Sequence, residues 1–294
     1  MVDKTAVWFF ALMNTLKWVV GPRKGRNGGI SMHIVVCVKQ VPDTTNVRIN
    51  PETNTLMREG VESIMNPFDE YALEEALKLK DAHGARVTVI SMGPPQAEVV
   101  LREAMARGAD DAVLLTDRAF AGADTLATSY AIAQAIKKVC AKPDLVFFGK
   151  QAIDGDTAQV GPGVSEFLDC TLVTYVKSVT VSDGSFTVET QMDEGVDVIT
   201  GKLPAVMTVV KDAAAPRFAS LSGWMQAKKT AIPRWGAKDV GAKPEMCGLD
   251  GSPTKVVKIF APPTKTGGMR MDGRDEPEAA VEAILKLLQD KGVS

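Results

Sequence analysis

The first half of the sequence alternates four times between a short apolar run and a longer segment with helical spacing, and this alternation constrains the fold most. The apolar runs, of which the first is rich in β-branched residues, predict strands at residues 33–41, 86–92, 111–115 and 145–148. The segments after them predict helices at residues 67–84, 93–105, 124–139 and 157–167. Four such units in a row predict an α/β fold with a doubly wound, mostly parallel, Rossmann-like sheet.

The helix at residues 67–84 has clear start and stop signals. Asn66 is expected at the N-cap, Pro67 at the first helical position and Asp69 in the first turn, while Gly84 is expected to end the helix. Sheets of this class bind ligands outside the carboxyl ends of their strands. Here those ends are residues 37–39 and 92–93, the loop at residue 116, and Gly149.

The second half of the sequence has a different pattern. Residues 173–181, 186–191 and 205–210 predict antiparallel strands that extend one edge of the sheet, and residues 46–57 predict a small hairpin. Residues 232–263 predict a long C-terminal arm with one strand at 255–260, followed by an amphipathic helix at 277–289. We therefore expect an N-terminal extension at residues 1–31, an α/β domain at 32–230, and an arm at 231–294 that packs on another subunit.

The composition is that of a soluble globular protein. The 294 residues are 45% apolar and 24% charged, and the formal net charge of −2 gives no electrostatic reason to expect nucleic acid as a partner. Four cysteines lack C-x-x-C spacing, which favours reduced thiols in a cytoplasmic protein over disulfides. With only His33 and His83 present, we expect neither a metal site nor a catalytic triad, and no catalytic acid–base pair stands out.

The N-terminal extension holds an apolar stretch at residues 6–20. Asn14 and Lys17 interrupt it, and its basic residues follow rather than precede it, so it fits neither a spanning helix nor a signal peptide. We expect these residues to be disordered, loosely amphipathic or an artefact of start-codon choice. Membrane contact is not expected, with a surface anchor as the lesser alternative.

The segment at residues 144–161 joins a predicted strand to a helix through a loop rich in Asp, Gly and Thr. Small residues at Gly149, Gly155, Ala158 and Gly161 would let backbone N–H groups approach an anion at the helix N-terminus. The loop therefore predicts a nucleotide phosphate cradle, although it matches neither a P-loop nor G-x-G-x-x-G. An ordinary helix cap is the alternative on pattern alone.

The amino-acid sequences of three stretches resemble those of the electron-transfer flavoprotein beta-subunit family. They are residues 149–161, residues 36–43 at the first strand, and residues 65–76 at the first helix, and the resemblance runs from Met32 to the C-terminal helix. It implies an adenine-nucleotide-binding fold and a heterodimer with an electron-transfer flavoprotein alpha subunit. Carried over position by position, it implies a nucleotide site formed by Cys37, Val38, Lys39, Asp43, Asn66, Pro67, Phe68, Asp69, Met92, Gly93, Asp124, Thr125, Thr128, Gly149, Lys150, Gln151, Ala152, Ile153, Asp154, Gly155, Asp156, Thr157, Ala158, Gln159, Val160 and Gly161.

Two features are similar to the electron-bifurcating branch of this family. Residues 117–129 place Asp124 and Thr125 at a helix N-terminus with Thr128 one turn later, and Asp43 follows the first strand. This resemblance implies that the bound nucleotide is FAD, reduced by NADH, with ferredoxin or flavodoxin as low-potential acceptor and an acyl-CoA dehydrogenase as the other partner. Lys39 is a candidate for tuning that flavin. The alternative is a structural AMP, with Thr125 and Thr128 serving only as a cap and a buried threonine.

Residues 216–229 combine apolar residues with lysines and match the family's recognition loop for dehydrogenases. The resemblance implies that Leu221, Trp224 and Met225 dock the partner, while a half-buried amphipathic turn is the alternative. Three classes of function remain open. They are a bifurcating redox subunit with its own FAD, a docking module with AMP, and a stand-alone regulatory domain of the same fold, which the arm and the recognition stretch disfavour.

Overall fold

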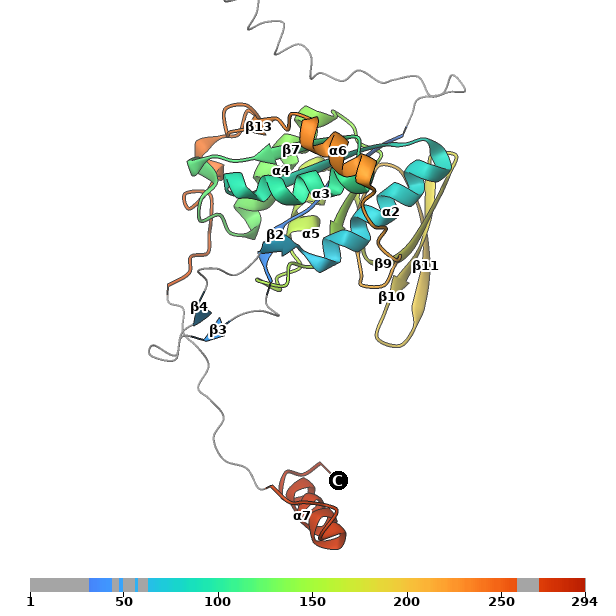
Figure 1. Ribbon diagram of the computed structural model, residues 1–294, viewed down its shortest axis with the longest axis vertical. Helices are drawn as coiled ribbons and strands as arrows, with labels where there is room; N and C mark the ends of the chain where they lie inside the picture. Colours follow the sequence, from blue (N-terminus) through green and yellow to red (C-terminus); the bar gives the residue numbers. More distant parts are fainter. Residues whose placement is uncertain (1–31, 44–47, 50–55, 58–62, 258–269, 294) are drawn as a thin grey trace, which may run out of the picture. The chain divides into compact units, whose positions relative to one another are not determined.

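Strand β1 (His33–Cys37) lies inside a nine-stranded sheet of the computed structural model, which describes residues 32–43, 48–49, 56–57, 63–257 and 270–293 (Figure 1). The strand order is β11-β10-β9-β12-β8-β1-β6-β7-β13. Strand β6 (Arg86–Met92) and strand β8 (Leu145–Gly149) both pair with β1 in parallel, and strand β7 (Asp111–Leu115) pairs in parallel with β6. The predicted α/β fold with a mostly parallel, doubly wound sheet is confirmed.

Helices cover both faces of this sheet. Helix α2 (Pro67–His83), helix α3 (Glu98–Arg107) and helix α6 (Leu221–Lys229) pack on one face, and helix α4 (Thr125–Val139) and helix α5 (Val160–Leu168) pack on the other (Figure 1). Each face has its own apolar core, because alternate residues of the parallel strands point to opposite sides. Ile34 and Val36 of β1 belong to the first core, and Val35 and Cys37 belong to the second.

The antiparallel extension differs in part from expectation. Strands β9 (Thr171–Ser182), β10 (Ser185–Gln191) and β11 (Val196–Lys202) are antiparallel, but β11 was not predicted. The predicted antiparallel strand at 205–210 is instead β12 (Ala205–Val209), which pairs in parallel with both β8 and β9. All five of its residues are buried, as is typical of a strand inside a parallel sheet.

Several element boundaries also differ from the prediction. The first strand ends at Cys37, and the residues after it form β2 (Gln40–Pro42), which pairs with β5 (Ser63–Met65). The α3 segment begins with a short 3₁₀ helix, η2 (Pro95–Ala97), and α5 begins at Val160 rather than at residue 157. Within the predicted hairpin at 46–57, β3 (Arg48–Ile49) and β4 (Leu56–Met57) form an antiparallel pair, as expected.

The described residues divide into two compact units between Val257 and Lys258. Residues 231–257, expected in an arm, lie within the first unit, where β13 (Arg234–Trp235) pairs with β7 and the 3₁₀ helix η4 (Pro244–Met246) packs on the α4 face. Residues 255–257 have no regular structure, and the rest of the predicted strand at 255–260 lies outside the described residues. The second unit holds helix α7 (Pro277–Asp290), which confirms the amphipathic helix predicted there.

Two further predictions concerned the N-terminal extension and contact with a membrane. The extension at residues 1–31 lies outside the described residues. Within the part of the chain that the structure describes, no helix combines the length and the apolar character needed to span a membrane.

Candidate functional site

A cavity of about 780 Å³ opens at the carboxyl ends of β1, β6 and β8. The chain runs from β1 to β6 on one side and later returns to β8 on the other, so the cavity lies at the topological switch point of the sheet. Its volume is within the range of about 300–1,000 Å³ that is typical of small-molecule sites.

The cavity brings together most of the predicted site residues. Those that line it are Cys37, Val38, Lys39, Asn66, Asp69, Met92, Asp124, Thr125, Thr128, Gly149, Lys150, Gln151, Ala152, Gly155, Thr157, Ala158, Gln159, Val160 and Gly161. The structure places the other predicted residues outside its lining: Asp43, Pro67, Phe68, Gly93, Ile153, Asp154 and Asp156. Lining residues that the sequence did not indicate are Ile90, Phe120, Gly122, Ala123, Leu126, Ile132, Phe148, Pro253 and Thr254.

Asn66 holds the cradle loop, defined here as residues 150–159, rather than capping helix α2. Its side chain makes no cap hydrogen bond. Instead its Nδ2 donates to the carbonyl of Gln151 at 2.9 Å, and its Oδ1 accepts from the N–H of Ile153 at 3.1 Å. The same Nδ2 donates to Asp69 at 2.9 Å. Because Asn66 is buried, these bonds fix the start of the loop against the sheet.

Asp69, in the first turn of α2, joins the ends of two strands. Its Oδ2 accepts from the N–H of Lys39 at 2.7 Å, and its Oδ1 accepts from the N–H of Gly149 at 3.1 Å. Burial raises the pKa of Asp69 to about 7, while the hydrogen bonds from Asn66, Lys39 and Gly149 oppose that rise. The carboxyl group therefore fixes the floor of the cavity where β1 and β8 end.

Lys39 extends from the end of β1 to the cradle loop. Its Nζ lies 2.7 Å and 2.8 Å from the two carboxylate oxygens of Asp154. Both side chains are partly exposed, so the pair contributes little to stability but places a cation at the cavity edge. Lys150, the other lining lysine, lies over the ring of Tyr175, with its Nζ 5.3 Å from the ring centroid.

The end of the cradle loop has backbone angles typical of an anion-binding concavity. Asp156 and Ala158 have φ angles of 49° and 54°, and Gln159 returns to the right-handed region with φ −105°. A left-handed residue followed by a right-handed one turns successive N–H groups toward one point. Helix α5 then begins at Val160 without a side-chain cap, which leaves its first N–H groups available for a ligand. We name residues 158–160 the nest.

Close packing against neighbouring protein atoms requires glycine at two positions around the loop. A Cβ on Gly149 would lie 2.4 Å from Oδ1 of Asp69, and a Cβ on Gly161 would lie 2.7 Å from Cγ2 of Thr208. Packing inside the protein therefore requires both glycines, whereas Gly155 faces open space. Both glycines also line the cavity, so the prediction that they make room for an anion stays a prediction.

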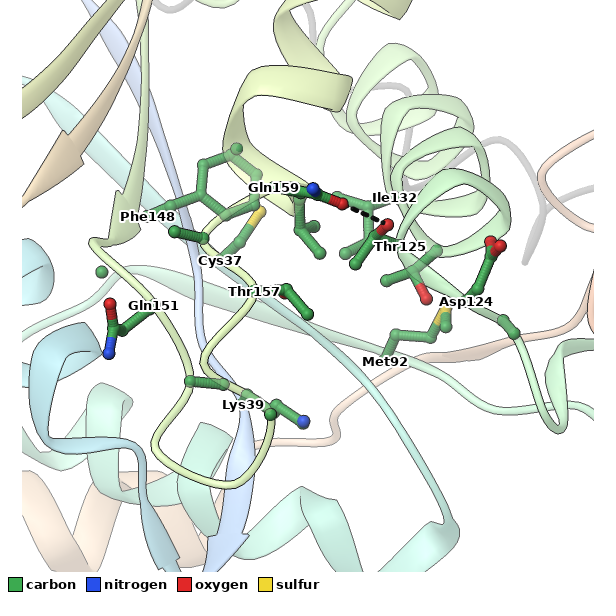
Figure 2. A pocket seen from close by; sticks show the side chains of 18 of the residues that line it. Cys37, Lys39, Met92, Asp124, Thr125, Ile132, Phe148, Gln151, Thr157 and Gln159 are labelled. Atoms are coloured by element: carbon green, nitrogen blue, oxygen red, sulfur yellow. Dashed lines mark hydrogen bonds between the residues drawn. The ribbon is translucent and has the colours of Figure 1, made fainter. Parts of the chain in front are cut away.

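Helices α4 and α5 begin beside each other at the cavity. The hydroxyl of Thr125 donates to Oε1 of Gln159 at 3.1 Å, so the two side chains face each other (Figure 2). Ser129 Oγ, one turn into α4, lies 2.6 Å from the carbonyl of Thr125 and 3.1 Å from that of Val160. Asp124 caps α4 as predicted, since its Oδ1 accepts from the N–H groups of Leu126 and Ala127.

The thiol in the cavity wall is unsuited to nucleophilic chemistry. Burial, together with the charge of Asp69, raises the pKa of Cys37 well above its usual value, so the thiol stays protonated. The four cysteines are free thiols. Across the described ranges, no group of three His, Cys, Asp or Glu side chains could hold a metal ion.

The predicted docking residues lie away from the cavity, on helix α6. Leu221 is 80% exposed, Met225 is 55% exposed and Trp224 is 37% exposed, and Phe218 just before the helix is 98% exposed. The segment is a helix capped by Ser220, whose Oγ accepts from the N–H of Gly223 at 3.0 Å, rather than a turn. Phe218 was not predicted, although an aromatic side chain beside Leu221 could have indicated it.

Arg217 fixes the start of this exposed segment. Its Nε lies 3.0 Å from both carboxylate oxygens of the buried Glu74, and its Nη2 lies 2.8 Å from Asp81. The backbone N–H of Arg217 also donates to Glu74, at 2.9 Å. The chain therefore reaches Phe218 from a point held firmly on helix α2.

Comparisons with known proteins agree with this architecture. A model of the electron transfer flavoprotein domain matches residues 53–240. Caffeyl-CoA reductase-Etf complex subunit CarD of Acetobacterium woodii is 50% identical over 257 residues, which are 87% of this chain and 98% of that protein. The electron transfer flavoprotein subunit beta of Megasphaera elsdenii is 48% identical over 268 residues, covering 88% and 99%. Protein FixA of Sinorhizobium fredii is 47% identical over 266 residues, covering 88% and 90%. The chain belongs to the electron transfer flavoprotein family, as a beta subunit.

Proposed function

We propose that this beta subunit binds FAD in the cavity at the switch point and acts in electron bifurcation, paired with an alpha subunit that holds a second FAD. FAD in this cavity would accept a hydride from NADH and pass the two electrons on singly. One would go to a low-potential acceptor such as ferredoxin or flavodoxin, and the other through the alpha-subunit FAD to an acyl-CoA dehydrogenase. A cytoplasmic setting is part of the same proposal.

The extent of the cavity is the observation that carries this proposal. It reaches from the cradle loop on one side to the start of α4 and residues 253–254 on the other. AMP would occupy the nest and the space beside it as far as Thr125, which bonds to Gln159 of the nest, but would leave the space between Thr125 and residues 253–254 unfilled. A dinucleotide such as FAD would extend into that space, where Met92, Phe120 and Ile132 offer apolar contacts and Thr125 and Thr128 offer hydroxyl groups.

The charges around the cavity support one orientation of the nucleotide. The nest and Lys39 lie on the cradle side and favour phosphates. Asp124 lies on the other side, and hydrogen bonds lower its pKa although burial acts to raise it, so the group is ionised and repels phosphates. The phosphates would therefore bind at the nest, and the uncharged ring system would face α4.

Lys39 is placed to influence the electron affinity of a bound flavin. Its ammonium group lies at the cavity edge, and its ion pair with Asp154 is partly exposed and therefore weak. A cation next to a flavin favours the reduced, negatively charged forms. We propose that Lys39 exchanges part of its contact with Asp154 for contact with the flavin.

The name of one relative supports the wider role. The Acetobacterium woodii relative is named as a subunit of a caffeyl-CoA reductase-Etf complex, which is a complex acting on an acyl-CoA. By analogy, we propose an acyl-CoA dehydrogenase as a partner of this chain. The exposed side chains on α6 would supply the docking surface, since large apolar side chains beside lysines form a contact patch.

The nucleotide content of the heterodimer tests this proposal. The chain is co-purified with its alpha subunit, denatured, and its released nucleotides are separated by chromatography. Two FAD molecules per heterodimer and no AMP would support the proposal, and the double variant Asp124→Ala with Thr125→Ala should then lose or weaken one of them. One FAD and one AMP would contradict it and leave the docking role with a structural AMP.

A further inference from the structure

The two carboxylate oxygens of Asp124 accept hydrogen bonds from two different parts of the chain. Its Oδ1 caps helix α4, accepting from Leu126 at 3.0 Å and Ala127 at 3.1 Å. Its Oδ2 accepts from the N–H of Thr254 at 3.1 Å and from the hydroxyl of Thr254 at 2.8 Å. An ionised carboxylate offers about four lone-pair sites, so these four donors occupy them. Asp124 is therefore not placed to bind a cofactor directly, contrary to the expectation from sequence.

A second set of contacts holds the same C-terminal segment. The N–H of Asp124 donates to Ser252 Oγ at 2.8 Å, and Ser252 Oγ donates to the carbonyl of Gly248 at 2.6 Å. Ser252 is buried, so these bonds are shielded from water. They attach residues 248–254 to the start of helix α4.

The stretch before Asp124 is shaped to receive this segment. A Cβ on Gly122 would lie 2.7 Å from the side chain of Leu249, and a Cβ on Gly248 would lie 2.5 Å from the carbonyl of Ala119. Asp117 accepts from the N–H of Ala237 at 3.0 Å. Residues 117–124 and 237–254 thus pack closely along much of their length. We name residues 252–254, with Phe120 and Ala123, the second wall.

The second wall bounds one part of the cavity only. Pro253 and Thr254 line the cavity together with Phe120 and residues 122–126. Asp124 and Thr125 lie on one side of the cavity, while Gln151 and Lys39 of the cradle side lie on the other (Figure 2). The nest itself reaches the start of α4, because Gln159 accepts the hydroxyl of Thr125 at 3.1 Å. The segment at residues 252–254 lies beyond that point, where Thr254 bonds to Asp124. We therefore expect a nucleotide that ends at the nest to reach Thr125 at most, and a longer one to extend to Pro253 and Thr254.

We propose that residues 117–124 determine nucleotide specificity indirectly, by holding residues 252–254 as the second wall, so that Pro253 and Thr254 contact FAD and do not contact AMP. Asp124 acts as a positioning residue in this arrangement. The proposal rests on the proposed function, because it assigns the second wall to the ring system of FAD. It also explains why the polar residues that resemble the bifurcating branch bond to the protein's own chain.

Asp124→Asn separates the two tasks of this side chain. Asparagine caps helices about as well as aspartate, so its oxygen can keep the bonds to Leu126 and Ala127. Its amide group would then face Thr254. The hydrogen bond from the Thr254 N–H is lost because two donors meet, whereas the Thr254 hydroxyl can turn to accept from the amide. Asp144→Asn is the matched control, because Asp144 accepts the N–H of His33 at 2.7 Å at the amino ends of the parallel strands, opposite the cavity.

The experiment measures FAD and AMP binding separately by equilibrium dialysis of nucleotide-stripped heterodimer, with the alpha-subunit FAD counted in each sample. Asp124→Asn should weaken FAD binding about tenfold, the effect of losing one hydrogen bond, and leave AMP binding unchanged. Hydrogen exchange should show faster exchange at Thr254 in this variant. In the wild type, FAD should slow exchange at residues 252–254, and AMP should not.

Three results would overturn the proposal. They are equal weakening of FAD and AMP binding, unchanged FAD binding although residues 252–254 exchange faster, and unchanged exchange at Thr254 in Asp124→Asn. A wild-type heterodimer that binds AMP but no second FAD would overturn the proposed function as well. That failure is distinguishable, because it is seen in the wild type before any variant is made.

Discussion

The carboxylate of Asp69 and the backbone N–H of Gly149 meet at 3.1 Å across a sequence separation of 80 residues. The other carboxylate oxygen accepts the N–H of Lys39 at 2.7 Å. One buried side chain on α2 therefore sets the relative positions of the two strand ends on either side of the switch point. The cavity has its shape because these two ends are held at one group.

The raised pKa of Asp69 predicts a specific dependence of stability on pH. The folded state keeps this proton up to about pH 7, while the unfolded chain loses it near the usual value of 3.8. Between those values the folded state binds more protons, so the contribution of Asp69 to the free energy of unfolding falls as pH rises. The free energy of unfolding of the wild type minus that of Asp69→Asn should fall by up to about 1.4 kcal/mol per pH unit over this range.

Denaturant unfolding at several pH values measures this difference, and Asp124→Asn provides a comparison of opposite sign. The pKa of Asp124 is lowered, so its contribution is present above 3.8 and is lost as pH falls further. The corresponding difference for Asp124→Asn should therefore change below about pH 4 and stay flat above it. A difference for Asp69→Asn that is flat between pH 4 and pH 7 would contradict the prediction.

Asn66→Ala should loosen the cradle loop. The substitution removes the acceptor for the N–H of Ile153 and the donor to the carbonyl of Gln151. Exchange of the Ile153 amide should become faster, and nucleotide binding should weaken by about tenfold, as expected for the loss of a buried polar contact. Hydrogen exchange and equilibrium dialysis measure the two effects. Unchanged exchange at Ile153 would show that the loop is held by other contacts.

Gly161→Ala should destabilise the protein by about 1–3 kcal/mol, because the added methyl group overpacks the core against Thr208. Thr208→Ser removes the Cγ2 atom that would clash and keeps the hydroxyl that accepts the N–H of Tyr175 at 3.2 Å. The double variant should therefore recover part of the loss in thermal unfolding. Gly155→Ala is the control, since no atom lies within 4 Å of the Cβ position there. Equal effects of the two glycine substitutions would refute this explanation.

Leu221→Ala with Phe218→Ala should slow electron transfer to the partner dehydrogenase without changing nucleotide content. Both side chains are exposed, so their truncation should change the free energy of unfolding by no more than about 0.5 kcal/mol. Steady-state reduction of the dehydrogenase measures the effect, and chromatography of released nucleotides provides the control. An unchanged rate of dehydrogenase reduction would show that the α6 surface does not dock the dehydrogenase.

Local sequence patterns were sufficient to predict the parallel core of the fold. Strands β6 and β7 were predicted to the residue, because apolar runs there are bounded by polar and turn residues. The start of α4 was also predicted, since Asp124 has the side chain of a good cap. In each case the information lies within a few residues of the element itself.

The parts that were missed depend on partners far away in the sequence. The parallel pairing of β12 depends on its insertion between β8 and β9, which its own five residues do not encode. Strand β11 contains Gly201, which is unfavourable in a strand but is needed because a Cβ there would lie 2.4 Å from the ring of Phe186. The second wall depends on a bond between residues 130 positions apart, Asp124 and Thr254, and no local pattern marks it.

Among the residues that the structure describes, strand β11 ends the sheet with one open edge, and Val196, Val198 and Ile199 on it are exposed. An open edge with apolar side chains invites pairing with any other extended chain, and Asp197 and Lys202 are the charged residues on β11 that oppose it. As the concentration of free chains rises during synthesis, pairing of two copies along this edge would compete with correct assembly. The yield of usable protein would then depend on how fast new chains are made as well as on how well each one folds.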